Sequence, residues 1–331
     1  MIQKSIQILK SLQQPNGLFI ASSPYVTTGY NRTWIRDNIY ESIGLEAVKS
    51  YTEAIKSYQA LLDILLKHEY KINWAIKEKP KHRYQYIHAR YDPLSGNEIL
   101  EEWGNKQNDA IGALLFKIGD LEGRGITIVR NTNDLRILQK LVHYLKSIEY
   151  WHDKDNGMWE ENEEVHASSV GACTAGLKSI SKIVNVPKDL IKKGQEILNK
   201  LLPRESETKD TDLALLSLIY PYNIVSEEQK LVILHNIEKR LVREKGVIRY
   251  IGDKYYYNGA EAQWTFGFPW LSIIYKYLKR PDLHAYYMRK TLEVMNANGE
   301  LPELYYANSD EYNENTPLGW AQALFLVMCT S

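Results

Sequence analysis

Residues 133–148 read NDLRILQKLVHYLKSI, and this stretch decides the class of fold. Its apolar residues recur at spacings of three and four, and the recurring positions are Leu135, Leu138, Leu141, Val142, Leu145 and Ile148. This period puts them on one face of an α-helix, so the stretch predicts an amphipathic helix whose apolar face is buried. The same helical period dominates the rest of the chain.

Helix-start signals extend this pattern along the chain. Ser226 followed by Gln229 has the spacing of a capping box and predicts a helix that begins there. Pro187, Pro281 and Pro317 each open an apolar-periodic stretch, where the first position of a helix is expected. About twelve helices are predicted in all, beginning near residues 1, 36, 52, 107, 133, 168, 187, 211, 226, 263, 281 and 317. No repeat of fixed length is evident, which disfavours a solenoid.

Five long stretches lack the helical pattern, at about residues 15–34, 71–106, 151–166, 243–262 and 298–316. Long loops in a compact domain are usually functional or disordered, and the many Trp and Tyr residues in these loops disfavour disorder. Their alternation with pairs of helices predicts helical hairpins that carry their loops at one end. No linker or shift of composition divides the chain, so residues 1–331 are predicted to form one domain.

The composition excludes several classes of function. The 331 residues include 41 basic and 41 acidic ones, whereas a nucleic-acid partner needs a basic excess or a basic face. Cys173 and Cys329 stand in apolar helical stretches and predict buried free thiols rather than a disulfide framework. The first ten residues resemble a helix rather than a signal peptide, and no apolar run is long enough to cross a membrane. We therefore expect a cytoplasmic protein without nucleic-acid or membrane partners; the oligomeric state is left open.

The aromatic residues are unusual, with 24 Tyr and 8 Trp against 5 Phe. Tyr and Trp combine a flat apolar face with a polar group, which suits sugar rings. Tyrosine used as a general amphipathic filler is the alternative, and composition alone favours it. The sequence contains no HExxH motif, no Cys/His cluster with zinc spacing, no Gly-rich phosphate loop and no Gly-x-Ser-x-Gly elbow. Neither a metal nor a cofactor is therefore expected.

Two junctions between a loop and a helix carry candidate sugar-binding residues. The candidates are Trp34, Arg36 and Asp37 at the first junction and Trp103, Gln107 and Asp109 at the second. An adjacent Arg and Asp offer a forked donor and a bidentate acceptor, which suit two neighbouring sugar hydroxyls. At the second junction the Trp103 indole suits stacking on a sugar ring, and the Gln107 amide suits hydrogen bonding to a sugar hydroxyl. Taken singly, each junction is better explained by ordinary helix-start chemistry, including a structural ion pair, than by a ligand.

The candidate acids lie in two other loops. In residues 157–161 a Gly turn leads into Trp-Glu-Glu, and Glu160 follows an indole that would desolvate it and raise its pKa, as a proton donor at neutral pH requires. An exposed acidic loop over residues 160–164 is the open alternative. His166 is expected to be a loop or core histidine. Glu303 follows a proline on a stiff, extended segment, which is a sound position for a general base.

The fourth loop combines one basic side chain with many aromatic ones. Residues 249–257 read RYIGDKYYY, and Trp264 follows them. Arg249 with Tyr250 and the nearby Asp would be suited to hold a sugar. The alternative is an aromatic cluster that merely flanks a helix.

Taken in order, these clusters resemble glycoside hydrolase family 15, the glucoamylases and their relatives. The matching motifs are W-x-R-D from Trp34, W-G-x-x-Q-x-D from Trp103, W-E-E from Trp159, R-Y-x-x-D-x-Y-Y from Arg249 and L-P-E from Leu301. A second resemblance, closer in wording, is to the glucoamylase-like N-terminal part of the phosphorylase kinase alpha and beta regulatory subunits. It rests on WIRDNIY at 34–40, ASSVG at 167–171, LLPR at 201–204 and LPELY at 301–305.

The first resemblance implies an all-α fold, an (α/α)6 barrel of about twelve helices with long loops at one end, in agreement with the helix count. It implies that Glu160 is the general acid and Glu303 the general base of an inverting, exo-acting hydrolase that needs no cofactor. It also implies that Arg36 and Asp37 hold the hydroxyls of the terminal glucose, and that Arg249 helps to fix it.

The remaining positions follow from the same resemblance. Glu161 would face the neighbouring sugar, and Trp34, Trp103 and Trp159 would form the walls. Trp264 and Trp320 are further candidates for substrate binding. The substrate would be an α-linked gluco-oligosaccharide of the maltose, isomaltose, trehalose or short-glucan type. The second resemblance favours a non-catalytic glycan-sensing or regulatory domain instead. Another (α/α)6-barrel activity, such as an epimerase or an unsaturated-uronide hydrolase, would explain the fold but not the ordered motifs.

Overall fold

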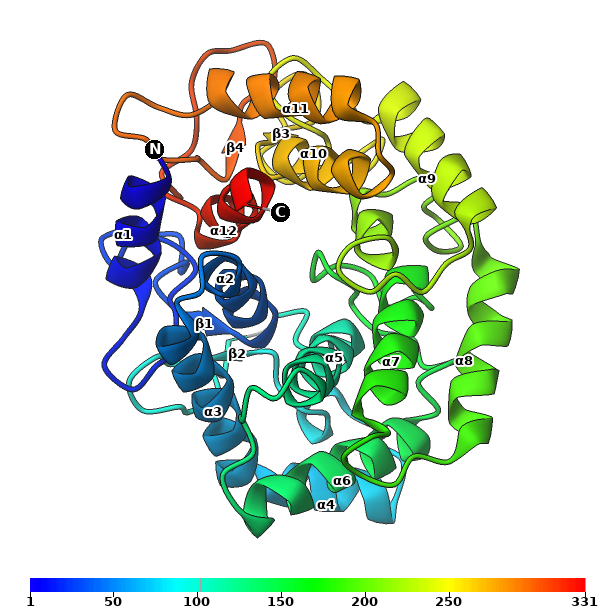
Figure 1. Cartoon of the computed structure of the whole chain (residues 1–331). Coiled ribbons are helices and arrows are strands. Elements are labelled where there is room, and N and C mark those ends of the chain that lie inside the picture. The colour runs from blue at the N-terminus through cyan, green and yellow to red at the C-terminus, as the bar shows by residue number, and fades with distance from the viewer. Residues whose placement is uncertain (102, 331) are drawn as a thin grey trace.

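The computed structural model describes residues 1–101 and 103–330, and its helices form two concentric rings (Figure 1). The inner ring consists of α2 (Ile35–Ala47), α5 (Asn108–Gly123), α7 (Ala167–Ile180), the 3-10 helix η2 (Leu213–Leu218), α10 (Gly267–Tyr277) and α12 (Gly319–Thr330). The outer ring consists of α1 (Ile2–Leu12), α3 (Tyr51–Lys67), α6 (Thr132–Ile148), α8 (Lys188–Leu201), α9 (Glu227–Arg240) and α11 (Pro281–Glu293). The expected (α/α)6 barrel is confirmed.

Burial explains why the helices sort into two rings. The inner α-helices are buried on almost every side, whereas the outer ones bury one stripe and expose the rest. Each inner element contacts the next, and α12 packs against α2, so the ring is closed. A short additional helix, α4 (Glu69–Lys77), lies beside α6 outside this scheme.

The helix that decided the fold class forms as predicted, with one exception. In α6 the side chains of Leu138, Leu141 and Leu145 are fully buried, but Leu135 is 38% exposed. The prediction for this residue was wrong because Leu135 lies at the edge of the apolar stripe, in the first turn. Ile137, on the inner side of the same turn, is buried in its place.

Several helix boundaries differ from those predicted. Ser226 and Gln229 form the expected capping box, and Pro281 is the first residue of α11. Pro187 lies one residue before α8, and Pro317 lies two residues before α12. The helix expected near residue 211 is the 3-10 helix η2, and the one expected near 263 begins only at α10, after a short strand. Helix α4 was missed, because most of it, residues 71–77, was assigned to the predicted loop 71–106.

The five long loops each lead into the N-terminal end of an inner element, so they meet at one end of the barrel. Two short antiparallel strand pairs join them: β1 (Thr33–Trp34) with β2 (Arg90–Tyr91), and β3 (Gln263–Trp264) with β4 (Leu304–Tyr305). The first and fifth loops are joined where the backbone N–H of Gly319 donates to the Ala21 carbonyl, over 2.9 Å. Loops distant in the sequence thereby build a single rim.

Both cysteines are free, Cys173 buried and Cys329 half-buried. Among residues 1–101 and 103–330, no helix combines the length and apolarity required to cross a membrane. In the same described residues, His, Cys, Asp and Glu side chains form no group suited to hold a metal ion.

Candidate active site

A cavity of about 350 Å³ opens among the loops. Ten of the fourteen side chains that the sequence singled out line it: Trp34, Asp37, Trp103, Trp159, Glu160, Glu161, Arg249, Trp264, Glu303 and Trp320. The other four, Arg36, Gln107, Asp109 and Tyr250, lie behind this lining and contact it. The five motifs therefore meet at one place in the fold, although they are spread over nearly the whole chain.

Glu160 is held by nitrogen groups from the segment that leads into α5 and from α2. The Trp103 indole N–H donates to Oε2 over 2.5 Å, and the Gln107 amide donates to Oε1 over 2.9 Å. The Arg36 guanidinium lies 3.5 Å from Oε1. The side chain is only 13% exposed, so the alternative of an exposed acidic loop is wrong for this residue. The indole that bonds to the acid comes from Trp103, whereas that of Trp159 donates to Asp212 over 2.7 Å.

The backbone at Glu160 is left-handed, with φ at 64°. This conformation costs a residue with a side chain about 1–2 kcal/mol, so the surrounding structure must impose it. The loop is closed at its base by a pair of backbone hydrogen bonds between Asp155 and Glu164. Gly104 packs so tightly on it that a Cβ at Gly104 would lie 2.3 Å from the Glu160 carbonyl oxygen.

Arg36 and Asp37 occupy the first turn of α2 but face different surroundings. Arg36 is buried and donates to Gln107 over 2.8 Å and to Asp109 over 3.0 Å. Asp37 lines the cavity, and among the described residues its only hydrogen-bond donor is its own backbone N–H. Burial raises the pKa of Asp37 to about 7, against the opposing charge of Arg36, and the charge of Glu160 raises it further. Asp37 therefore offers acceptor oxygens to a ligand, whereas Arg36 binds the side chains of Gln107 and Asp109 behind the cavity lining.

Glu303 is fully buried and is held by asparagines from the same loop. Its Oε2 accepts hydrogen bonds from the Asn313 amide and from the Asn315 amide, the latter over 2.7 Å. Burial raises the pKa of Glu303, and hydrogen bonds from Tyr30, Asn315 and Asn313 oppose that rise. The Tyr30 hydroxyl lies 3.2 Å from that of Tyr255. A carboxylate held in this way, in the cavity wall, is suited to accept a proton.

Buried Arg249 and half-buried Glu161 form an ion pair at the side of the cavity. Arg249 makes a bidentate contact with Asp253, both distances being 2.6 Å, and its Nη2 donates to Glu161 over 2.9 Å. The other oxygen of Glu161 accepts from Lys209 and from the Tyr250 hydroxyl, each over 2.7 Å. Glu161 thus has protein partners on both of its oxygens.

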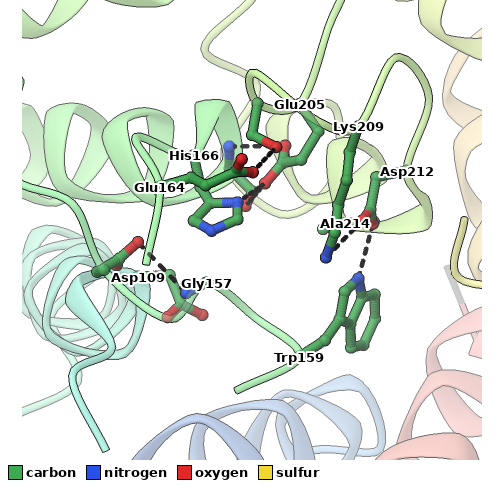
Figure 2. A network of polar contacts seen from close by, with 12 residues as sticks. Asp109, Gly157, Trp159, Glu164, His166, Glu205, Lys209, Asp212 and Ala214 are labelled. Carbon is green, nitrogen blue, oxygen red and sulfur yellow. Dashed lines mark hydrogen bonds and ion pairs between the residues drawn. The ribbon is translucent and has the colours of Figure 1, made fainter. Parts of the chain in front are cut away.

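A second polar network supports the cavity from behind (Figure 2). Lys209 lies 3.8 Å from Asp212, and Asp212 in turn holds the Trp159 indole. Burial raises the pKa of Asp212 to about 6, against the opposing charge of Lys209. Trp320 stacks on Phe266 with ring centroids 4.9 Å apart and adds an aromatic wall. The aromatic walls are therefore fixed in orientation by the protein.

The sequence did not single out several residues of the site. They are Tyr30, Asn313, Asn315, Lys209 and Asp212. Tyr30, Asn313 and Asn315 lie within the aromatic, polar loops, which is the only signal that pointed to them, whereas Lys209 and Asp212 lie in the segment before η2, outside the predicted loops. Their partners are set by which loops meet, and no local spacing contains that information.

Fold and cavity together define a class, the (α/α)6 barrels of the glycosidases. A solved glycosidase variant in complex with glucose matches with a TM-score of 0.86 at 16% identity, over 99% of this chain and 95% of that one. A bacterial glucoamylase complexed with acarbose matches with a TM-score of 0.74 at 16% identity, over 99% of this chain and 54% of that one. At these identities the likeness shows the fold alone.

The sequence pattern of the family described as Glycosyl hydrolases family 15 matches residues 1–328. The chain belongs to this family. A curated relative, the probable phosphorylase b kinase regulatory subunit alpha of Caenorhabditis elegans, is 26% identical over 89% of this chain. This chain spans 30% of the length of that relative. Both resemblances inferred from the motifs are confirmed.

Proposed function

We propose that the chain is an inverting, exo-acting glycoside hydrolase that releases glucose from α-glucosides. Glu160 donates a proton to the leaving oxygen while Glu303 takes a proton from a water that attacks the opposite face of the sugar. The bond from the anomeric carbon to the leaving oxygen breaks, and a bond to the water oxygen forms. The observation that carries this proposal is that Glu160 and Glu303, from different loops, line the same cavity.

The rest of the lining supports a sugar as the ligand. Asp37 presents free acceptor oxygens, and indole rings flank them; this combination matches hydroxyl edges and C–H faces. Arg36 holds Glu160 in place from behind the lining rather than facing the ligand. The two structural matches that are complexed with glucose and with acarbose favour the same class of ligand.

The anomer of the product tests the mechanism. Inversion needs roughly 6.5–9.5 Å between the two carboxyl groups, which leaves room for the water. We expect NMR of the purified protein with maltose, isomaltose and trehalose to show β-glucose appearing first from at least one of them. Release of α-glucose first would refute the inverting assignment, and the same spectra report the linkage.

A non-catalytic glycan-sensing domain is the second candidate. It is favoured by the relatives named as regulatory subunits, of whose length this chain spans under a third. Binding of these sugars without any release of glucose, measured in the same samples, would favour it over the hydrolase.

We also propose that residues 1–331 act as one domain in the cytoplasm. The family match over residues 1–328 supports a single unit. Two free cysteines are in keeping with a reducing compartment.

A further inference from the structure

The loop of residues 155–164 carries Glu160, and a buried histidine fills the space beneath it. The His166 ring lies directly under Gly157: a Cβ on Gly157 would be 2.8 Å from the ring Nε2. His166 is 3% exposed and lies between Gly157 and Glu205 (Figure 2). It is also the residue immediately before α7, an inner helix, so its backbone is fixed by the barrel.

Both ring nitrogens of His166 have a partner. Nδ1 lies 3.3 Å from Oε1 of Glu205, and Nε2 lies 3.4 Å from the carbonyl oxygen of Asn162. Glu205 is itself held by the backbone N–H of Ser168 over 3.1 Å. The two partners belong to different segments, because Asn162 is part of the loop that carries Glu160 and Glu205 is not. The ring therefore links that loop to the barrel.

The link needs a protonated ring. A neutral imidazole has one N–H group and donates to one acceptor, whereas an imidazolium donates from both nitrogens. Both partners of His166 are acceptors, so only the charged form satisfies them together. Burial lowers the pKa of His166, but the hydrogen bond that the ring donates to Glu205 and the charges of Asp155 and Glu205 outweigh burial and raise it to about 9, against an opposing charge from Lys209.

We propose that the His166 imidazolium is a positioning residue for Glu160, because it ties the Asn162 carbonyl and the Glu205 carboxylate together and so fixes the loop between them. The consequence for turnover rests on the proposed function, whereas the positioning itself does not. Loss of the ring proton frees one of the two contacts and lets the acid move away from Trp103 and Gln107.

NMR of the full chain tests the positioning without any substrate. The reporters are the side-chain nitrogens of His166, identified by their loss in His166→Gln, and the indole N–H of Trp103, identified in Trp103→Phe. We expect both signals to shift with a common midpoint near pH 9, the value to which its surroundings raise the pKa of His166. A Trp103 signal that stays constant while His166 titrates would overturn the proposal. This titration uses the unaltered protein, so it holds even if a variant folds poorly.

Steady-state kinetics provide the second test. The substrate is the glucoside that the NMR experiment with maltose, isomaltose and trehalose shows to be hydrolysed. In His166→Gln we expect kcat to fall about 10- to 100-fold with little change in KM, since a misplacement of about 1 Å can cost about 100-fold. The alkaline fall of kcat near pH 9 should disappear in this variant. His284→Gln is the matched control, because His284 is half-buried on the outer helix α11 and, among the described residues, its ring hydrogen-bonds only to Ser272. If no glucoside is hydrolysed, the proposed function fails, but the NMR titration still tests the positioning role of His166.

Discussion

At the scale of single residues, the contrast between the two acids matters most. Glu160 is held by Trp103 and Gln107, which lie just before and at the start of another helix, whereas the amide donors of Glu303 are asparagines of its own loop. The position of the acid therefore depends mainly on how separate segments meet, and that of the base depends mainly on how its own loop is folded, with Tyr30 as a further donor from the first loop. Substitutions around the two acids should accordingly have different effects.

Replacing Glu303 by Gln should remove turnover and leave the fold intact. The amide keeps the shape of the carboxyl and still has an oxygen to accept from Asn315, but it is unable to take a proton from water. We expect turnover to fall about 100-fold or more, with circular dichroism and the unfolding midpoint close to those of the unaltered protein. Glu311→Gln, an exposed position on the same loop, is the control. Near-normal turnover in Glu303→Gln would exclude this residue as the base.

Replacing Asn315 by Ala should move the acidic limb of the pH–activity profile to higher pH. The Asn315 amide stabilises the ionised form of Glu303 and so opposes the upward effect of burial on its pKa. Without this donor the pKa rises further, and the base is protonated over a wider acidic range. A shift of about one pH unit is expected, since a hydrogen bond to a charged group contributes about 1.5–3 kcal/mol and one pKa unit is about 1.4 kcal/mol.

The measurement is kcat/KM as a function of pH, with exposed Asn298→Ala as the control. A shift towards lower pH would contradict the role given to Asn315. The sequence singled out Glu303, which lies at a bend just before β4, but it gave no sign of the roles of Asn313, Asn315 or Tyr30. The two asparagines depend on how the loop returns past the acid, and Tyr30 depends on how the first loop meets it; both are tertiary properties.

At the scale of elements, the loop 155–164 shows how backbone and packing act together. Gly157 has φ of 62° and lies against the His166 ring, whereas Gly125 has φ of 78° and open space, with nothing within 4 Å of where a Cβ would lie. Replacing either by Ala imposes the same kind of backbone strain, about 1–2 kcal/mol. Only Gly157→Ala adds a collision with a buried ring.

We therefore expect Gly157→Ala to lower the free energy of unfolding by at least about 1 kcal/mol more than Gly125→Ala does, since forcing extra volume into a packed site costs about 1–3 kcal/mol. Urea denaturation of both variants measures the difference. Equal losses would mean that the loop moves away from His166 at no cost. Such a result would also weaken the positioning role of the ring.

The elements that the sequence predicted poorly share a physical cause. Periodicity identifies helices that bury one stripe, and α6 is the clearest case. Helix α4 has nine residues, too few to establish a period, and η2 has the narrower 3-10 geometry. The inner helices are buried all round, so their pattern alone did not separate the inner ring from the outer one.

At the scale of the whole molecule, the barrel depends on the seam where α2 meets α12. Gly44 of α2 lies so close to Ala323 of α12 that a Cβ on Gly44 would be 2.6 Å from the Ala323 Cα. Gly44→Ala should force the two helices apart and lower the free energy of unfolding by about 1–3 kcal/mol. Gly123→Ala should instead raise it by about 0.4–1 kcal/mol, because among residues 1–101 and 103–330 only the flexible end of Lys182, 3.7 Å away, lies within 4 Å of where the Cβ would be.

Urea denaturation of both variants measures whether the free energy of unfolding falls in Gly44→Ala and rises in Gly123→Ala. Stabilisation by Gly44→Ala would show that the seam is looser than its contacts indicate. The closed ring itself was implied by the family resemblance and agreed with the number of helices. The contact between α2 and α12 could not be predicted from the sequence, because the two helices are far apart in the chain and share no sequence pattern.

The seam has a consequence for the order in which the molecule is made. Helix α2 and the first loop are translated before the partner helix α12 and the loop that bears Glu303. A nascent chain that has not yet reached α12 therefore carries an open arc of helices in which α2 lacks this partner, a state that invites chaperone binding. The cavity is complete only after translation has passed residue 320, because Trp320 is part of its lining.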